Sequence, residues 1–304
     1  MRRTFYIVGP TATGKSELAA DVAREIGAEI VSADAFQIYG GLDLLTAKPE
    51  SSTLAKAPHH LIGTIPLTEE MNAEKFRRAA TCAIEETNSR RKLAIVVSGS
   101  GFYIKTLTHG LAPLPESDAK LREKLNAMSL NELRSQLAQV DPEAARKIDL
   151  KNRRRVVRAL EICLLTGKPV SAQRPQGGAS RSDPHTGVFV FRDREELYER
   201  INQRVETIFE RGVIEEVRGA GVTSATASQM IGLREIREFL AGKKTLPQCI
   251  EEIQRATRRY AKRQLTWFRR QTNFVPLNLS FLTHKEAVKL ISLRVLSEPG
   301  TRDD

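Results

Sequence analysis

The sequence predicts an α/β fold in which a parallel sheet domain is interrupted by a helical insertion. Short apolar runs alternate with helical patterns over the first third of the chain, which is typical of strands joined by crossover helices. A glycine-rich motif separates the first apolar run from the first helical pattern. After residue 110 a proline-rich segment, GLAPLPESD, precedes consecutive short helical patterns, which predict a separate lobe.

Five apolar runs predict the strands of the sheet. They lie at residues 4–8, 29–33, 61–65, 93–97 and 187–192. The first two runs end at residues of chemical interest, a glycine and an aspartate. Because ligands of such sheets bind beyond the carboxyl ends of parallel strands, we expect the functional site at that edge.

The insertion carries recognisable helix boundaries. Ser129 and Glu132 form a capping box, and Asp141 followed by Pro142 predicts another helix start. A longer helix over 153–166 ends at Gly167, and the segment 174–187 is predicted to be a loop. The remainder is predicted to be helical to about residue 272, followed by a weakly patterned tail whose last residues we expect to be mobile.

These boundaries predict two domains. Residues 1–115 and 186–304 form the catalytic core with C-terminal helices, and residues 116–185 form the inserted helical lobe.

Composition limits the class of protein. Of the 304 residues, 40% are hydrophobic and 28% are charged, and no run of about 18 apolar residues could span a bilayer. Cys82, Cys163 and Cys249 lie far apart without zinc-ligand spacing, and with no signal peptide they predict a cytoplasmic protein. A net charge of +11 indicates a polyanionic partner, although a basic surface alone would also account for it.

A phosphate-binding motif occupies residues Gly9 to Ser16. The run GPTATGKS satisfies GxxxxGK[ST] and lies between the first predicted strand and a helix, as a P-loop NTPase-like sheet requires. Its backbone N–H groups would converge on phosphate oxygens, Lys15 would supply a charge, and the Ser16 hydroxyl would hold Mg²⁺. The predicted diphosphate-binding residues are Gly9, Thr11, Ala12, Thr13, Gly14, Lys15 and Ser16.

The motif does not specify the reaction. The run 93–97 leads into SGSG rather than an aspartate, and the guanine-reading NKxD motif is absent from the sequence. An acidic residue instead follows the second strand, at Asp34, which we expect at the tip of a neighbouring strand, close to the phosphate loop. A base acting on an acceptor would suit this position; a capping or turn aspartate is the structural alternative.

Several further motifs resemble the tRNA dimethylallyltransferase family in their order and spacing. They span residues 9 to 269 and are Ser32-Ala-Asp34-Ala-Phe-Gln37-Ile-Tyr39, Gly41-Leu-Asp43, Thr46-Ala-Lys48-Pro49, Pro58-His59-His60-Leu61, Ser98-Gly-Ser-Gly-Phe-Tyr103, Arg155-x-x-Arg158-Ala-Leu-Glu161, Arg200-Ile-x-x-Arg204, Ile231-Gly232 and Lys262-Arg-Gln-Leu-Thr-Trp267. The sequence departs from the family pattern at Leu45, Ser98, Ser100 and Leu233.

The resemblance implies a reaction and a set of site residues. The family transfers a dimethylallyl group from dimethylallyl diphosphate to N6 of the adenosine immediately 3′ of the tRNA anticodon, with Mg²⁺ present, and its helical insertion grips the anticodon stem-loop. By matched position, Asp34 would accept the amine proton, and Lys15 and Arg204 would assist the diphosphate. The implied tRNA contacts are Asp34, Ala35, Phe36, Gln37, Ser100, Arg154, Arg155, Arg158, Lys262, Arg263, Gln264, Trp267 and Arg269.

Two arginine-rich stripes fit such a partner. One is predicted on a C-terminal helix from Arg255, Arg258, Arg259, Lys262, Arg263, Arg269 and Arg270, and the other on the insertion from Arg153, Arg154, Arg155 and Arg158. A solvated basic face is the alternative interpretation of either stripe. Trp267, the only tryptophan, suits a core position as well as a stacking platform.

Three other functions remain open at this stage. A prenyltransferase acting on free adenine nucleotides would share the phosphate motif and Asp34 but has little use for the stripes. A P-loop kinase of small metabolites and a tRNA-binding module without chemistry are the others. Nothing in the sequence requires a protein partner or a membrane, and we expect a monomer.

Overall fold

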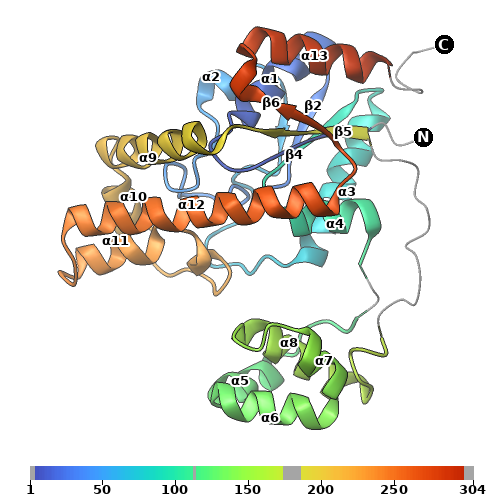
Figure 1. The fold of residues 1–304 in the computed structure, drawn as a ribbon, viewed down its shortest axis with the longest axis vertical. Coiled ribbons are helices and arrows are strands. Elements are labelled where there is room, and N and C mark those ends of the chain that lie inside the picture. The colour runs from blue at the N-terminus through green and yellow to red at the C-terminus, as the bar shows by residue number, and fades with distance from the viewer. Residues whose placement is uncertain (1–3, 112–113, 174–185, 298–304) are drawn as a thin grey trace. The chain divides into compact units, whose positions relative to one another are not determined.

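The computed structural model describes residues 4–111, 114–173 and 186–297. The chain divides into two units, Met1–Thr108 with Asp183–Asp304, and His109–Ser182. The first unit holds the sheet and the second is helical (Figure 1). The second unit begins near the end of helix α4 (Gly101–His109), a few residues before the boundary expected at 116.

The first unit is built on six parallel strands. They are β1 (Thr4–Val8), β2 (Glu29–Ser32), β3 (His59–His60), β4 (Ala94–Ser98), β5 (Thr186–Phe191) and β6 (Val275–Asn278), in the order β3-β2-β4-β1-β5-β6. The predicted α/β class with a parallel sheet is therefore confirmed. We expected the strand before Asp34 to be next to β1. Instead β4 pairs with both β1 and β2 and lies between them.

One predicted strand is wrong, and three elements of the C-terminal tail are missing from the prediction. The edge strand β3 precedes the predicted run 61–65, because Leu61 and Gly63 adopt positive φ values of 63° and 64° and turn the chain away. Ile65 then makes only an isolated bridge with Tyr39. The weakly patterned tail forms β6, the 3₁₀ turn η2 (Leu279–Phe281) and α13 (His284–Ser297). The end of the tail, 298–304, and the predicted loop 174–185 lie outside the described residues.

Helices α1 (Lys15–Ile26) and α13 cover one face of the sheet (Figure 1). The side chains of β1 alternate, so that Phe5 and Ile7 face these helices. Leu18 and Val22 of α1 are buried against them, and Ile291 of α13 joins the same cluster.

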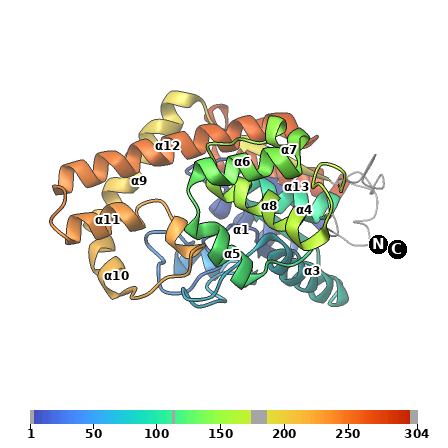
Figure 2. The ribbon, with the colours of Figure 1, turned by 90° about the horizontal axis from the view of Figure 1, so that it is seen from below.

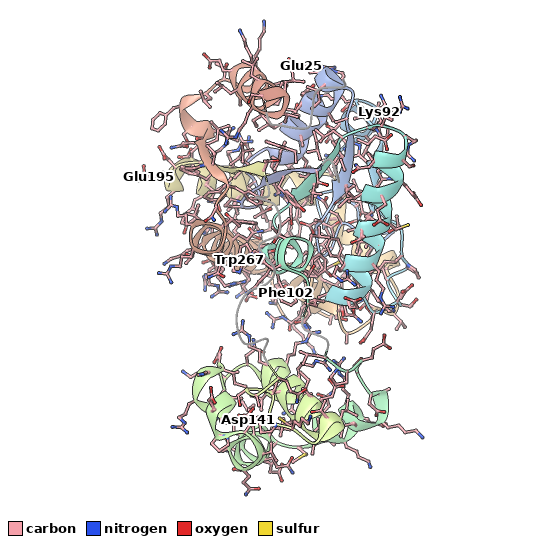
Figure 3. The ribbon with its side chains drawn as sticks, turned by 90° about the vertical axis from the view of Figure 1, so that its right-hand side faces the viewer. Glu25, Lys92, Phe102, Asp141, Glu195 and Trp267 are labelled. Atoms are coloured by element: carbon pink, nitrogen blue, oxygen red, sulfur yellow. The ribbon has the colours of Figure 1, made fainter. Side chains whose placement is uncertain are left out.

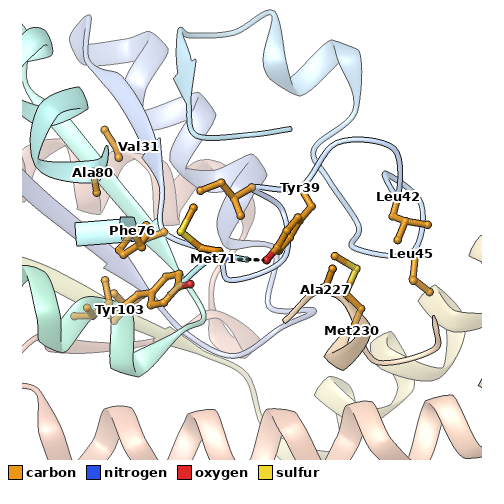
Figure 4. Packing of buried hydrophobic residues seen from close by; sticks show 14 of the residues in the cluster. Val31, Tyr39, Leu42, Leu45, Met71, Phe76, Ala80, Tyr103, Ala227 and Met230 are labelled. Atoms are coloured by element: carbon orange, nitrogen blue, oxygen red, sulfur yellow. Dashed lines mark hydrogen bonds between the residues drawn. The ribbon is translucent and has the colours of Figure 1, made fainter. Parts of the chain in front are cut away.

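Helices from several parts of the chain cover the other face. Phe76 of α3 (Ala73–Ser89) stacks on Tyr103 of α4 with ring centroids 3.9 Å apart. The Tyr39 hydroxyl accepts a hydrogen bond from the Met71 backbone N–H at 3.1 Å (Figure 4). This packing fixes the loop that follows Asp34 against the sheet.

The remaining helices of the first unit follow β2 and β5. They are α2 (Ser51–Leu54), α9 (Arg194–Glu210), α10 (Val213–Gly219), η1 (Ala227–Gln229), α11 (Leu233–Leu240) and α12 (Leu246–Gln271). Helices α9 to α12 pack together, with α12 running the length of the group (Figure 2). None of the described helices combines the length and apolar character needed to cross a bilayer.

The second unit consists of α5 (Ala119–Ala127), α6 (Leu130–Val140), α7 (Pro142–Lys147) and α8 (Arg153–Thr166). The capping box of Ser129 and Glu132 is present, Asp141 caps α7, and Gly167 ends α8 with φ 66°. Leu133 and Leu137 form its core with the apolar face of α8.

A buried carboxylate links β2 to its neighbours. Glu29 accepts hydrogen bonds from the Arg90 guanidinium at 2.6 and 3.2 Å and lies 2.8 Å from His60 Nε2. These bonds, with Arg90 contributing most, lower the pKa of Glu29 to about 2, although burial opposes the shift. His60 thus has a structural contact with this carboxylate.

We predict that Glu29→Gln lowers the free energy of unfolding at pH 7 by about 3 kcal/mol, because a pKa depressed from about 4.5 to about 2 represents that much stability. A depressed carboxylate contributes fully above its unfolded pKa and loses its contribution as pH falls. The difference between wild type and variant should therefore shrink below about pH 4.5 and vanish toward pH 2. Urea unfolding across this range measures it.

Glu74 offers the matched control. Arg77 and Arg78 lower its pKa to about 2 as well, but Glu74 lies on the surface of α3. Solvent screens such a pair, so Glu74→Gln should cost less than about 1 kcal/mol. Equal losses in the two variants would contradict the role given to burial at Glu29.

Candidate functional site

The phosphate-binding motif forms the turn between β1 and α1. Gly9 must be glycine, because a Cβ there would lie 2.1 Å from the Val190 carbonyl oxygen of β5. Gly14 caps α1 with φ 89°, a conformation that favours glycine. The Gly9 N–H donates to the Ser98 carbonyl at 3.0 Å, which ties the loop to the end of β4. The loop thus presents the positive end of α1 at the carboxyl edge of the sheet.

Three arginines hold the phosphate loop from outside. Arg192, which follows β5, donates to the Thr13 carbonyl at 3.0 Å, and Arg200 of α9 donates to the Ala12 carbonyl at 2.9 Å. One helical turn later, Arg204 donates to the Thr11 hydroxyl at 3.0 Å. Of these three arginines, only Arg204 was predicted to have a role in the site. The spacing of Arg200 and Arg204 by four residues places both on one face of α9, which was the available signal.

Asp34 lies in the loop after β2. Its Oδ1 accepts hydrogen bonds from the backbone N–H groups of Phe36 at 2.9 Å and Gln37 at 3.3 Å, so the aspartate does form the turn that was our structural alternative. Within the described part of the chain, no group hydrogen-bonds Oδ2. The turn therefore orients the carboxylate and leaves one oxygen for another partner.

The charged groups of the two loops influence one another. Burial lowers the pKa of Lys15 to about 8, while Asp34 raises it and Arg204 lowers it further. Burial also lowers the pKa of Arg204, against the effect of Asp34. The carboxylate and the two cations therefore belong to one electrostatic cluster, although Asp34 and the phosphate loop follow strands that are not adjacent.

Small residues and two tyrosines line the region between Asp34 and the loop. The tip of β4 is Ser98-Gly99-Ser100-Gly101; Ser98 donates to the Ala33 carbonyl at 2.7 Å, and Ser100 accepts from the Ala35 N–H at 3.1 Å. Burial raises the pKa of Tyr103, with smaller effects of Tyr39 and Asp34. Burial followed by Asp34 raises the pKa of Tyr260 to about 12. Tyr260 had no role in our sequence analysis.

Helix α12 carries the predicted basic stripe. A groove of about 420 Å³ on its outer side is lined by Lys262, Arg263, Thr266, Trp267, Arg270 and Gln271. Trp267 is half-buried: it packs edge-on against Phe268 with centroids 5.1 Å apart and covers Gly101 at the start of α4, near Phe102 (Figure 3). It therefore combines a packing role with a surface that faces the groove.

Some of the α12 residues expected to face RNA point elsewhere. Arg258 of the stripe donates to Asn202 of α9, and Gln264, one of the implied tRNA contacts, is buried with an exposed fraction of 6%. Arg269 is exposed and lies over the Phe191 ring at 5.4 Å. The exposed stripe is therefore narrower than the sequence pattern indicated.

The stripe on the insertion is divided as well. Arg153 donates to the carbonyls of Leu125, Asn126 and Met128 at the end of α5. Arg158 pairs with the fully buried Glu161 at 2.6 Å and donates to the Pro115 carbonyl. Arg154 and Arg155 are exposed on α8.

Residues 35 to 37 are predicted to contact RNA, but their side chains contact other parts of this chain. The Gln37 side chain donates to the Ala47 carbonyl at 2.9 Å, and Phe36 packs against the main core. Their backbone nevertheless follows Asp34 directly and lines the same edge of the sheet.

Comparison with known proteins gives a consistent result. The family described as IPP transferase matches residues 37–271. A tRNA dimethylallyltransferase of Citrifermentans bemidjiense is 45% identical over 278 residues, covering 89% of this chain and 90% of the relative. The corresponding enzyme of Geobacter sulfurreducens is 44% identical over 280 residues, covering 88% and 89%.

Solved structures agree in fold. A tRNA isopentenylpyrophosphate transferase from Bacillus halodurans is similar with a TM-score of 0.68 and 32% identity, covering 97% of each chain. A eukaryotic dimethylallyltransferase acting on tRNA has a TM-score of 0.79 at 24% identity, covering 98% of this chain and 81% of that one.

The lowered pKa of Lys15 predicts a pH dependence for anion binding. The ammonium form predominates below about pH 8 and is lost above it, so the affinity for inorganic pyrophosphate should fall as pH rises through 8. Isothermal titration calorimetry from about pH 6.5 to 9.5 measures this. Pyrophosphate itself ionises, so Lys15→Arg serves as the reference at each pH. Parallel curves for the two proteins would refute the assignment to Lys15.

Proposed function

The chain belongs to the IPP transferase family, whose matched relatives are tRNA dimethylallyltransferases, and from this premise we propose that it transfers a dimethylallyl group from dimethylallyl diphosphate to N6 of the adenosine immediately 3′ of the tRNA anticodon. The chain is a prenyltransferase that modifies tRNA. The observation that carries the proposal is the electrostatic cluster of Asp34, Lys15 and Arg204 between the β2 loop and the phosphate loop.

In the proposed reaction the carbon–oxygen bond of the allylic diphosphate breaks and a carbon–nitrogen bond to N6 forms. The diphosphate leaves with the electron pair of the broken bond. Backbone N–H groups of the phosphate loop, Lys15 and Arg204 stabilise that anion, and each strong donor contributes on the order of 3 kcal/mol in a dry site. Arg204 also holds the Thr11 hydroxyl, which lies in the same loop.

Asp34 receives the proton that N6 releases as the new bond forms. The exocyclic amine is a poor nucleophile because its lone pair is delocalised, so a positioned base contributes roughly 10²- to 10⁴-fold. Oδ1 is held by the turn amides, and Oδ2 is the oxygen proposed to accept the proton. The adenine must leave its stack, which costs a few kcal/mol.

Magnesium is the proposed metal. Mg²⁺ prefers oxygen ligands and is commonly bound by one or two protein groups together with substrate phosphates. The Ser16 hydroxyl, in the first turn of α1 and not engaged by another described group, is such a ligand. When bound, the ion would neutralise charge on the diphosphate.

Two separate surfaces are proposed to contact tRNA, the groove on α12 and the exposed arginines of α8. The groove includes Lys262, Arg263 and Arg270 beside Trp267, a pairing of cations and aromatic surface that suits a folded RNA. The two surfaces belong to different units of the chain. The relatives' activity favours tRNA over free nucleotides as the acceptor and over a kinase reaction.

The direct test is incubation of the protein with unmodified tRNA, dimethylallyl diphosphate and Mg²⁺, followed by mass analysis of the nucleosides. Adenosine carrying one dimethylallyl group next to the anticodon is the expected product. Prenylation of AMP without tRNA modification, or ATP consumption without transfer, would overturn the proposal.

We predict that Asp34→Asn lowers the rate of prenyl transfer by about 10²- to 10⁴-fold, because asparagine keeps the turn but cannot accept the proton. Dissociation constants for tRNA should stay within about threefold of wild type. Asp118→Asn, which alters a helix cap on α5 in the other unit, is the control. Near-normal turnover in Asp34→Asn would remove the residue from catalysis.

The divided stripe on α8 gives a second prediction. Arg155→Ala should weaken tRNA binding and reduce the slope of log affinity against log salt by about 1, without loss of stability. Arg158→Ala should instead lower the free energy of unfolding by about 1 to 3 kcal/mol, because Glu161 loses a partner in the core of the unit. Binding between about 50 and 200 mM salt, with urea unfolding of both variants, separates the two roles. If the two variants changed tRNA affinity equally and stability equally, the separate roles given to Arg155 and Arg158 would be contradicted.

A further inference from the structure

Gln264 of α12 makes two long-range hydrogen bonds to the edge of the sheet. Its Oε1 accepts from the Thr11 N–H of the phosphate loop at 3.0 Å, and its Nε2 donates to the Gly99 carbonyl at the tip of β4 at 2.8 Å. One partner is a donor and the other an acceptor, so only one orientation of the carboxamide satisfies both. The side chain is 6% exposed and therefore not available to a ligand on the outer face of the helix.

The two atoms that Gln264 joins belong to the phosphate loop and to the tip of β4, the two segments next to the proposed reaction site. Thr11 carries the hydroxyl that Arg204 holds, and Gly99 precedes Ser100, which supports the loop of Asp34 through the Ala35 N–H. The approach to β4 is close: a Cβ on Gly99 would lie 2.5 Å from Gln264 Nε2. A small shift of the carboxamide would therefore move both loops.

The proposed RNA groove lies on the side of the same helix next to Gln264. Arg263 precedes Gln264 directly and is exposed in the groove, and Trp267, one turn later, rests on Gly101. Helix α12 thus contacts the β4 tip through Gln264 and Trp267, and it contacts the phosphate loop through Gln264 and through the cluster in which Ala261 packs near Ala12. Its groove is open to a polyanion. If residue 264 only packed α12 against the core, an apolar side chain of similar size would be sufficient there. The two hydrogen bonds of Gln264 therefore indicate a further role.

We propose that Gln264 is a positioning residue through which α12 holds the phosphate loop in register with the tip of β4, so that tRNA bound on the outer face of α12 orders the diphosphate site. The inference rests on the proposed function only in taking this face as the RNA-binding one. Loss of the carboxamide leaves the Thr11 N–H and the Gly99 carbonyl without their partner, and the phosphate loop loses its hydrogen bond to α12.

Gln264→Met tests the proposal, because methionine keeps the length of the side chain and removes both hydrogen bonds. The dissociation constant for inorganic pyrophosphate, measured by calorimetry, should rise about tenfold or more. The dissociation constant for tRNA should stay within about threefold of wild type. The matched control is Gln254→Met, since Gln254 joins α12 to Asn202 and Glu206 of α9 and not to the phosphate loop; it should leave pyrophosphate affinity unchanged.

A second measurement uses the wild-type protein, in case the variant does not fold. Amide hydrogen exchange of the phosphate-loop residues, Thr11 included, should slow at least severalfold when tRNA is added without pyrophosphate. The proposal would be overturned if tRNA left the exchange rates unchanged or if Gln264→Met kept its affinity for pyrophosphate. It would also be overturned if Gln254→Met lost as much pyrophosphate affinity as Gln264→Met. None of these measurements requires turnover, so a wild-type protein that failed to prenylate tRNA would refute the proposed function while still deciding the role of Gln264.

Discussion

The spacing between the phosphate loop and Asp34 is the constraint on which the site depends. The two follow β1 and β2, which are separated by β4, so their strands lie about 10 Å apart. A large side chain at the end of β4 would fill that space, and the residues there are Ser98, Gly99, Ser100 and Gly101. The two serines of this tip hydrogen-bond the backbone that flanks Asp34: the Ser98 hydroxyl donates to the Ala33 carbonyl, and the Ser100 hydroxyl accepts from the Ala35 N–H.

The same spacing explains the electrostatics. Two cations close together on the phosphate side, Lys15 and Arg204, disfavour each other, and burial disfavours both charged forms. Asp34 is the group that counteracts these effects across the tip of β4. An anion bound at the loop would relieve the repulsion between the cations, which favours a negatively charged ligand in the space that β4 leaves open.

Local signals predicted much of the fold and part of the site, while long-range contacts account for what was missed. The phosphate motif, β1, β2 and α1 depend on residues near in sequence, and they are present as expected. The run at 61–65 has the composition of a strand, but Leu61 and Gly63 turn it out of the sheet. For Arg158 the partner Glu161 is three residues away and was visible in the sequence. For Gln264 the partners lie 253 and 165 residues away, and no pattern along the chain indicates them.

Net charge is a weaker indicator of an RNA surface than the neighbours of each cation. Many arginines hold carbonyls, hydroxyls or carboxylates within the chain, among them Arg153, Arg158, Arg192, Arg200 and Arg204. Another basic pocket, lined by Arg234, Arg237 and Lys243, also contains Glu238, which ion-pairs with Lys244. The groove on α12 differs because its described lining contains cations and Trp267 but no carboxylate. A phosphate backbone would meet no like charge there, and this property, rather than the number of basic residues, supports α12 as the RNA-facing element.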